Sequence, residues 1–85
     1  MFKLGDKVEW ASQSGGSLKV KRGEVVKVVA PKTRPNFMAL DALHNSRNVY
    51  GGGSPRNHES YIVKVQEGNR KPVLYWPRVS GLMAE

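Results

Sequence analysis

Basic side chains gather in one short segment of this 85-residue chain, from Ser17 to Arg34. Its sequence, SLKVKRGEVVKVVAPKTR, holds six lysine and arginine residues against one acid, Glu24, so the segment carries +5 of the chain's net charge of +7. Cationic groups at this density neutralise phosphates and release counterions, which is the chemistry of nucleic-acid binding. The alternative is the solvated outer face of a strand pair, on which lysines discourage edge-to-edge association.

The isoelectric point, near 10.1, exceeds what solubility alone requires and favours the first interpretation. We therefore expect DNA or RNA as the partner, bound through a basic surface. The cations expected to contact it are Lys19, Lys21, Arg22, Lys32, Arg34, Arg56, Arg70, Lys71 and Arg78.

Aromatic residues are the second resource for binding. Tyr75 and Trp76 are adjacent in the segment KPVLYWP, and successive side chains of a strand point to opposite faces, so one of the two rings is expected at the surface. Such a ring beside Arg78, with Arg70 and Lys71 across the hairpin, can stack on an unpaired base. The other use of exposed rings is a cage for a methylated ammonium, which typically adds an acid. Because acids are scarce here, the sequence predicts Trp76 or Tyr75 as a stacking platform.

Groups suited to catalysis or metal binding are sparse. His44 and His58 each lack a second ligand at metal-binding spacing, and Glu59 would point away from His58 in a strand. The serines lie mainly in turns, and GGGSPR lacks the Lys-Ser/Thr ending of a phosphate-binding loop. We therefore expect a domain that is not an enzyme and takes no metal, cofactor or small-molecule substrate.

Length and cysteine content limit the class of protein. A chain of 85 residues supports one small core, so we expect a single domain over residues 1–85. It has no cysteine for disulfides, and MFKLGDKVEW lacks the apolar region of a signal peptide. No apolar run approaches the ~20 residues that span a bilayer. These features predict a cytoplasmic protein outside the membrane.

Short strands alternate with glycine and proline turns along the chain. KVEWAS predicts a first strand with Val8 and Trp10 on its buried face. The valine-rich KVKRGEVVKVVA predicts a second strand broken at Gly23, and SYIVKV a third with alternating faces. Gly68-Asn69 predicts a hairpin turn into a fourth strand that ends at Pro77, followed by a tight turn and a last short strand or tail.

The 27 residues from Pro31 to Asn57 form a long loop between the second and third of these strands. Within it, RPNFMALDALHN places apolar residues at helical spacing behind Asn36, a favourable N-cap, and predicts one short helix. The remainder, NSRNVYGGGSPRN, predicts a flexible tip, and its GGGS has the composition of an engineered linker.

Apolar side chains in this loop support a different class of function. In a loop they either pack back on the sheet or are offered to another protein. The alternative is therefore a protein-binding or inhibitory module, of a kind that phages or mobile elements use, with the basic face meeting an acidic partner. Its candidate residues are Phe37, Met38, Leu40, Leu43 and Tyr50.

Four to five short strands with one long loop predict a mainly all-β fold, a small and strongly bent barrel whose closure removes exposed edges. LGDKVEW followed by KVKRGEVVKVVAPK, over Leu4 to Lys32, resembles the KOW motif of ribosomal proteins and transcription-elongation factors. Over a longer span, GDKVEW, HESYIV and the strand ending at Pro77, with Leu82 beyond, resemble the Tudor-like domain of hypervirulence-associated bacterial proteins. Both resemblances imply an SH3-like barrel, and neither fixes a ligand.

Overall fold

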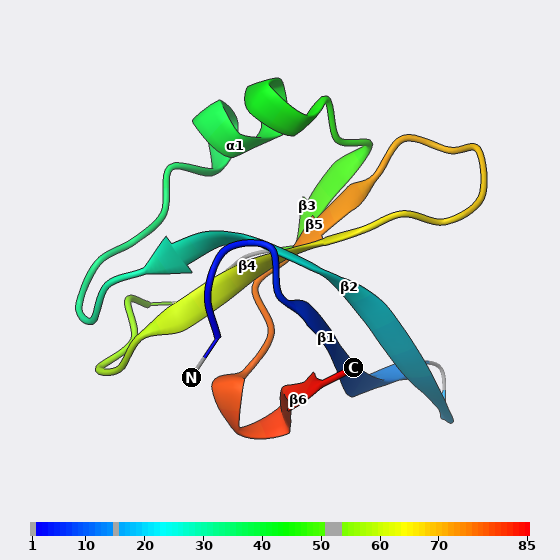
Figure 1. The fold of residues 1–85 in the computed structure, drawn as a ribbon, viewed down its shortest axis with the longest axis horizontal. Helices are drawn as coiled ribbons and strands as arrows, with labels where there is room; N and C mark the ends of the chain where they lie inside the picture. Colours follow the sequence, from blue (N-terminus) through cyan, green and yellow to red (C-terminus); the bar gives the residue numbers. More distant parts are fainter. Residues whose placement is uncertain (1, 15, 51–53) are drawn as a thin grey trace.

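A computed structural model describes residues 2–14, 16–50 and 54–85 as one mainly β domain built on a mixed six-stranded sheet (Figure 1). The elements are β1 (Lys7–Ser14), β2 (Ser17–Val29), α1 (Phe37–His44), β3 (Asn48–Tyr50), β4 (Ser60–Val65), β5 (Val73–Tyr75), the 3-10 turn η1 (Val79–Gly81) and β6 (Met83–Ala84). The strand order is β3-β5-β4-β2-β1-β6, and its neighbours are antiparallel except for the parallel pair β3 and β5. The predicted tight turn and last short strand are confirmed by η1 and β6.

The predicted break of the second strand at Gly23 is wrong, because β2 runs continuously through this residue. Its first half pairs with β1 and its second half with β4, and Glu24 takes part in both pairings. The strand bends where these halves meet (Figure 1). A Cβ atom on Gly23 would lie 2.7 Å from Val63 Cγ1 and closer still to the carbonyl oxygen of Lys64. Glycine at this position therefore permits the close approach of β4 rather than ending the strand.

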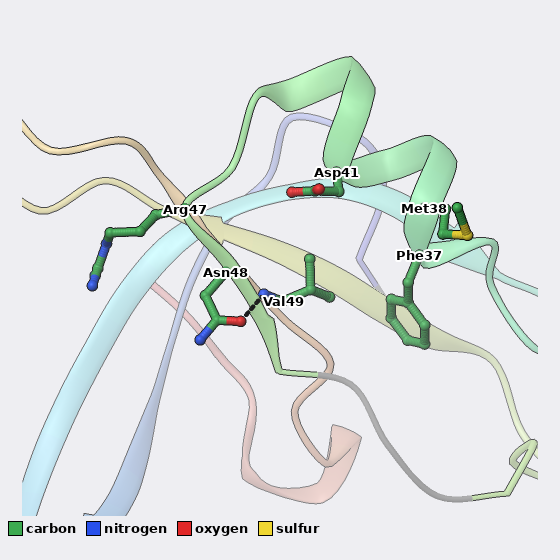
Figure 2. Close-up of a pocket in the computed structure, with 6 residues that line it drawn as sticks. All are labelled: Phe37, Met38, Asp41, Arg47, Asn48 and Val49. Carbon is green, nitrogen blue, oxygen red and sulfur yellow. Dashed lines mark hydrogen bonds between the residues drawn. The ribbon is translucent and has the colours of Figure 1, made fainter.

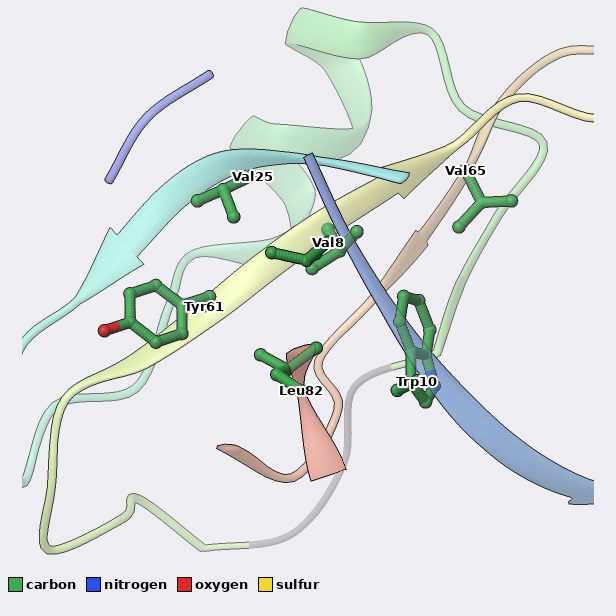
Figure 3. Packing of buried hydrophobic residues seen from close by; sticks show 7 residues of the cluster. Val8, Trp10, Val25, Tyr61, Val65 and Leu82 are labelled. Atoms are coloured by element: carbon green, nitrogen blue, oxygen red, sulfur yellow. The ribbon is translucent and has the colours of Figure 1, made fainter. Parts of the chain in front are cut away.

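Side chains of β4 alternate between two faces, as predicted, and they contribute to two separate hydrophobic clusters. The first cluster lies toward β1 and β6 (Figure 3). It consists of Val8, Trp10, Val25, Tyr61, Val63, Val65 and Leu82, which confirms the predicted buried face of the first strand. The second lies on the other face, beneath α1, and consists of Val29, Leu40, Ile62, Leu74 and Trp76. Both faces of β4 are therefore covered.

The helix predicted in the long loop is confirmed, together with its cap. The Asn36 side chain accepts a hydrogen bond from the Ala39 backbone N–H at 3.1 Å, and the helix ends at Asn45 in a left-handed conformation with φ 49°. Leu40 is buried in the second cluster and Phe37 packs against it. These two candidates of the protein-binding interpretation therefore lie against the sheet. Over the described ranges, no helix has the length and apolar character needed to cross a membrane.

The predicted flexible tip is wrong for Asn48–Tyr50, which form β3 and pair in parallel with β5. The predicted linker-like Gly51-Gly52-Gly53 lies outside the described residues. The predicted closed barrel is also corrected: β3 and β6 lie at opposite ends of the strand order, and the sheet stays open. The physical reason is that β3 occupies the outer edge of β5, whereas the two residues of β6 pair with β1.

Candidate nucleic-acid interface

Four side chains from four strands meet at the edge of the first cluster. Lys21 lies opposite Trp10 in the register of β2 and β1, and Tyr50 lies beside Tyr75 in that of β3 and β5. The Tyr50 and Tyr75 rings stack with centroids 5.2 Å apart and an interplanar angle of 19°. Trp10 meets Tyr75 edge-on at 5.6 Å, and Lys21 Nζ lies over the Tyr75 ring, 5.0 Å from its centroid. We call Lys21, Tyr50 and Tyr75 the aromatic platform.

A groove of about 440 Å³ adjoins the platform between β2 and the residues that follow β4. Lys19 and Lys21 are two residues apart on β2, so they share a face of the strand and line the groove together. Arg22 also lines it, but its Nε pairs with Glu9 Oε2 on the neighbouring strand at 3.0 Å. Besides Lys21, which belongs to the aromatic platform, Lys19 is therefore the predicted cation that adjoins it.

Of the two rings predicted as alternative stacking platforms, Trp76 is not the exposed one, since this residue is 5% exposed. Its indole Nε1–H donates to Ser60 Oγ at 2.8 Å, and its ring lies 5.7 Å from that of Phe37 on α1. Alternation does separate Tyr75 from Trp76, but α1 covers the face that receives Trp76. Tyr75 is the half-buried ring of the pair, and it lies beside Tyr50 of the edge strand β3.

Arg56, predicted as a phosphate contact, is engaged in internal bonds. Its Nη1 donates to the Pro77 carbonyl oxygen at 2.8 Å and its Nη2 to that of Trp76 at 2.9 Å. The guanidinium also lies over the Trp76 ring, 4.1 Å from the centroid. Burial, and then the neighbouring charge of Arg78, lower the pKa of Arg56. This arginine joins the long loop to the end of β5.

Replacing Arg56 with alanine is expected to lower the free energy of unfolding by about 2 kcal/mol, since hydrogen bonds from a charged donor and a cation–π contact are lost together. Arg56→Lys keeps the charge but not the planar fork, so it should recover less than half of this loss. Arg70→Ala, at an exposed position, is the matched control and should change stability by less than about 0.5 kcal/mol. Urea denaturation measures all three, and equal effects of Arg56→Ala and Arg70→Ala would contradict the internal role.

The other predicted cations come from other parts of the chain than Lys19 and Lys21. Lys32 and Arg34 follow the opposite end of β2, Arg70 and Lys71 lie in the connection between β4 and β5, and Arg78 follows Pro77. All five are exposed. The basic segment that the sequence presents as one cluster is thus spread along a strand that crosses the molecule (Figure 1).

A second hollow, of about 300 Å³, lies between α1 and β3 and is shown in Figure 2. Phe37, Met38 and Val49 supply its apolar side, whereas the Arg47 side chain points away from them. Asp41 in its lining accepts a hydrogen bond from Ser46 Oγ. Of the residues proposed for protein binding, Met38 and Leu43 are 85% and 76% exposed on the helix and Tyr50 belongs to the platform.

The histidines and acids singled out in the sequence have local roles. Glu59 accepts a hydrogen bond from the Tyr61 hydroxyl at 2.8 Å, and burial raises the pKa of that tyrosine. Burial, with the charge of Lys64, lowers the pKa of His44, whose buried Nε2 has no hydrogen-bond partner among the described residues. Across the part of the chain that the structure describes, no three histidine or acidic side chains gather as metal ligands would.

Comparison with known proteins gives no significant match to this chain. No protein-family model matches the chain, and neither a curated protein nor a solved structure is significantly similar to it. What the domain binds must therefore be argued from its own side chains.

Proposed function

We propose that this domain is a non-enzymatic module that binds nucleic acid through the aromatic platform and the adjoining Lys19. The observation that carries the proposal is the position of Lys21, whose ammonium lies over Tyr75, the ring on which the exposed Tyr50 stacks. A cation and an exposed ring on the same aromatic stack match the two parts of a nucleic acid, its phosphates and its bases.

Electrostatics supports the same surface. The chain carries +7 overall, and the segment that contains Lys19 and Lys21 carries most of it. Such a charge attracts polyanions over a distance of about a Debye length, and contacts with phosphates then determine how tightly they bind. Because phosphate contacts are insensitive to base sequence, we expect binding with little sequence preference.

Salt should weaken this binding in proportion to the number of phosphates contacted. Log K is expected to fall linearly with log salt, by roughly 0.7–0.9 per phosphate. Replacing Lys19 and Lys21 with glutamine should flatten that slope by about 1.5, since two contacts are removed. Anisotropy titrations of labelled single-stranded and duplex oligonucleotides, over roughly 50 to 200 mM salt, measure the slopes.

Lys27→Gln is the matched control for these titrations. It removes the same charge from the same strand, but Lys27 is exposed in the half of β2 that pairs with β4, away from the groove. Its slope should stay close to that of the wild type. Absence of binding to every oligonucleotide at low salt would contradict the proposal. If Lys27→Gln flattened the salt slope as much as the Lys19 and Lys21 double variant, the groove would not be the binding site.

For the fold, we propose kinship with SH3-like barrels, as the two sequence resemblances imply. Supporting features are the antiparallel succession of β1, β2, β4 and β5, the bend at Gly23, and the return of β6 to the free side of β1. In this interpretation, α1 and β3 are an insertion between the second and third strands of an SH3-like sheet. The KOW and Tudor-like resemblances then concern the remaining strands.

A protein-binding module is the second candidate, favoured by the exposed Met38 and Leu43 on α1. Point substitutions separate it from nucleic-acid binding better than deletion of the loop does, because Leu40 is part of the second cluster. Met38→Gln with Leu43→Gln should leave oligonucleotide affinity and its salt slope unchanged. A protein that the wild type captures and this double variant does not would support the second candidate.

A further inference from the structure

The Tyr50 ring is the outermost member of a row of aromatic side chains. One of its faces lies on Tyr75, yet 55% of the residue remains exposed, so the accessible area must lie mainly on the opposite face and the ring edge. Tyr75 in turn rests edge-on against the buried Trp10. An exposed flat face backed by two further rings is the arrangement onto which another planar group can stack.

The backbone fixes the position of this ring. The Tyr50 carbonyl oxygen accepts a hydrogen bond from the Trp76 N–H at 3.1 Å, which ties the end of β3 to a residue of the core. Val49, the preceding residue, packs against the second cluster, and its N–H donates to the Asn48 side chain at 2.8 Å. Since strand residues alternate, anchoring Val49 on one face directs Tyr50 to the other. The ring is thus preorganised, which lowers the entropy cost of binding.

The charge around the rings distinguishes between the two kinds of ligand that exposed aromatic rings bind, a methylated ammonium and a nucleic-acid base. A cage for a methylated ammonium needs open ring faces and a site free of other cations. Here the Lys21 ammonium already lies 5.0 Å from the centroid of Tyr75 and would repel a second cation. The same ammonium attracts an anion, and a base attached to a phosphate supplies a planar group together with that anion.

We propose that Tyr50 is the stacking platform for one unpaired base of a single-stranded nucleic acid, with Lys21 contacting a phosphate of the same strand. This inference rests on the proposed function and narrows it to single strands, because the bases of a duplex do not expose their faces. Stacking tolerates every base, so the site selects strandedness rather than sequence.

The test uses three labelled probes on the folded wild-type chain: an oligothymidine of about 12 nucleotides, an abasic sugar-phosphate strand of the same length, and the corresponding duplex. We expect the oligothymidine to bind about 5- to 150-fold more tightly than the abasic strand, the range that one stacked base contributes. Tyr50→Ala should remove this advantage and leave affinity for the abasic strand unchanged. Tyr50→Phe keeps the ring and should bind as the wild type does.

Each outcome bears on one proposal. If no probe binds, the proposed function fails and the stacking site with it. If the base-bearing and abasic strands bind equally well to the wild type, Tyr50 stacking is overturned while electrostatic binding stands, and this comparison needs no variant. If Tyr50→Phe lost as much affinity for oligothymidine as Tyr50→Ala, the hydroxyl rather than the ring would account for that affinity, and stacking would be overturned. Binding of a trimethyllysine peptide that depends on Tyr50 and that oligothymidine does not displace would overturn it in favour of a cage.

Discussion

Replacing Gly23 with alanine is expected to lower the free energy of unfolding by about 3 kcal/mol, the upper end of the usual cost of overpacking. The added methyl group would stand 2.7 Å from Val63 Cγ1 and still nearer the Lys64 carbonyl oxygen. The carbonyl belongs to the β4 backbone, which pairs on both sides and is buried on both faces, so it cannot move aside without loss of packing. For a domain of this size, such a loss lowers the melting temperature by roughly 12–24 °C.

Gly81→Ala is the matched control, because a Cβ at Gly81 would have no atom of the described residues within 4 Å, its two chain neighbours aside. Its melting temperature should stay within a few degrees of the wild type. Circular dichroism melts of both variants provide the measurement. If Gly23→Ala had the same melting temperature as Gly81→Ala and the wild type, β4 would not lie against Gly23 as described. The bend of β2 would then have another cause.

Local signals in the sequence predicted the elements whose formation depends on neighbouring residues. Val8 and Trp10 point to the core because alternation and hydrophobicity agree there, and α1 begins after Asn36 because that side chain caps it. The faces of β4 followed from the same two-residue period. In each case, the pattern that predicts the element lies within a segment of fewer than about ten residues.

Features that depend on long-range pairing were missed. β3 is three residues long, and its pairing with β5 joins segments about 25 residues apart, which no local pattern specifies. That pairing in turn keeps the sheet open and stacks Tyr50 on Tyr75. Asn48-Val49-Tyr50 did carry one signal, since valine and tyrosine favour strands, but the surrounding glycine, serine and asparagine outweighed it.

The candidate site was predicted in part for the same reason. Charge and aromaticity predict Lys19, Lys21 and Tyr75, whereas the sequence places Tyr50 among the apolar loop residues of the protein-binding alternative. Arg56 was counted as a surface cation because the sequence does not show that its donors reach the Trp76 and Pro77 carbonyl oxygens. Composition identifies the groups that can bind a phosphate, but only the tertiary structure shows which of them are engaged in internal bonds.

Trp76 is the residue at which this distinction has the largest consequence. Trp76→Ala is expected to cost about 4 kcal/mol of folding free energy, because truncating a core tryptophan removes its packing and leaves a cavity. Its ring fills the space between Phe37 and the Arg56 guanidinium, so both lose a partner. A protein of 85 residues has only about 4–13 kcal/mol of stability, so this variant should be largely or partly unfolded at 37 °C.

The indole N–H makes a sharper test than the alanine variant alone. Ser60→Ala leaves the buried Nε1–H without its acceptor and should cost about 1–3 kcal/mol. Trp76→Phe removes the donor and some packing, and adding Ser60→Ala to it should cost far less than in the wild-type background, since the donor is already gone. Urea denaturation of the two single variants and the double variant measures this coupling. If the two effects instead added, or if Trp76→Ala were as stable as Tyr50→Ala at the exposed platform, the Trp76 ring would not be buried against Ser60.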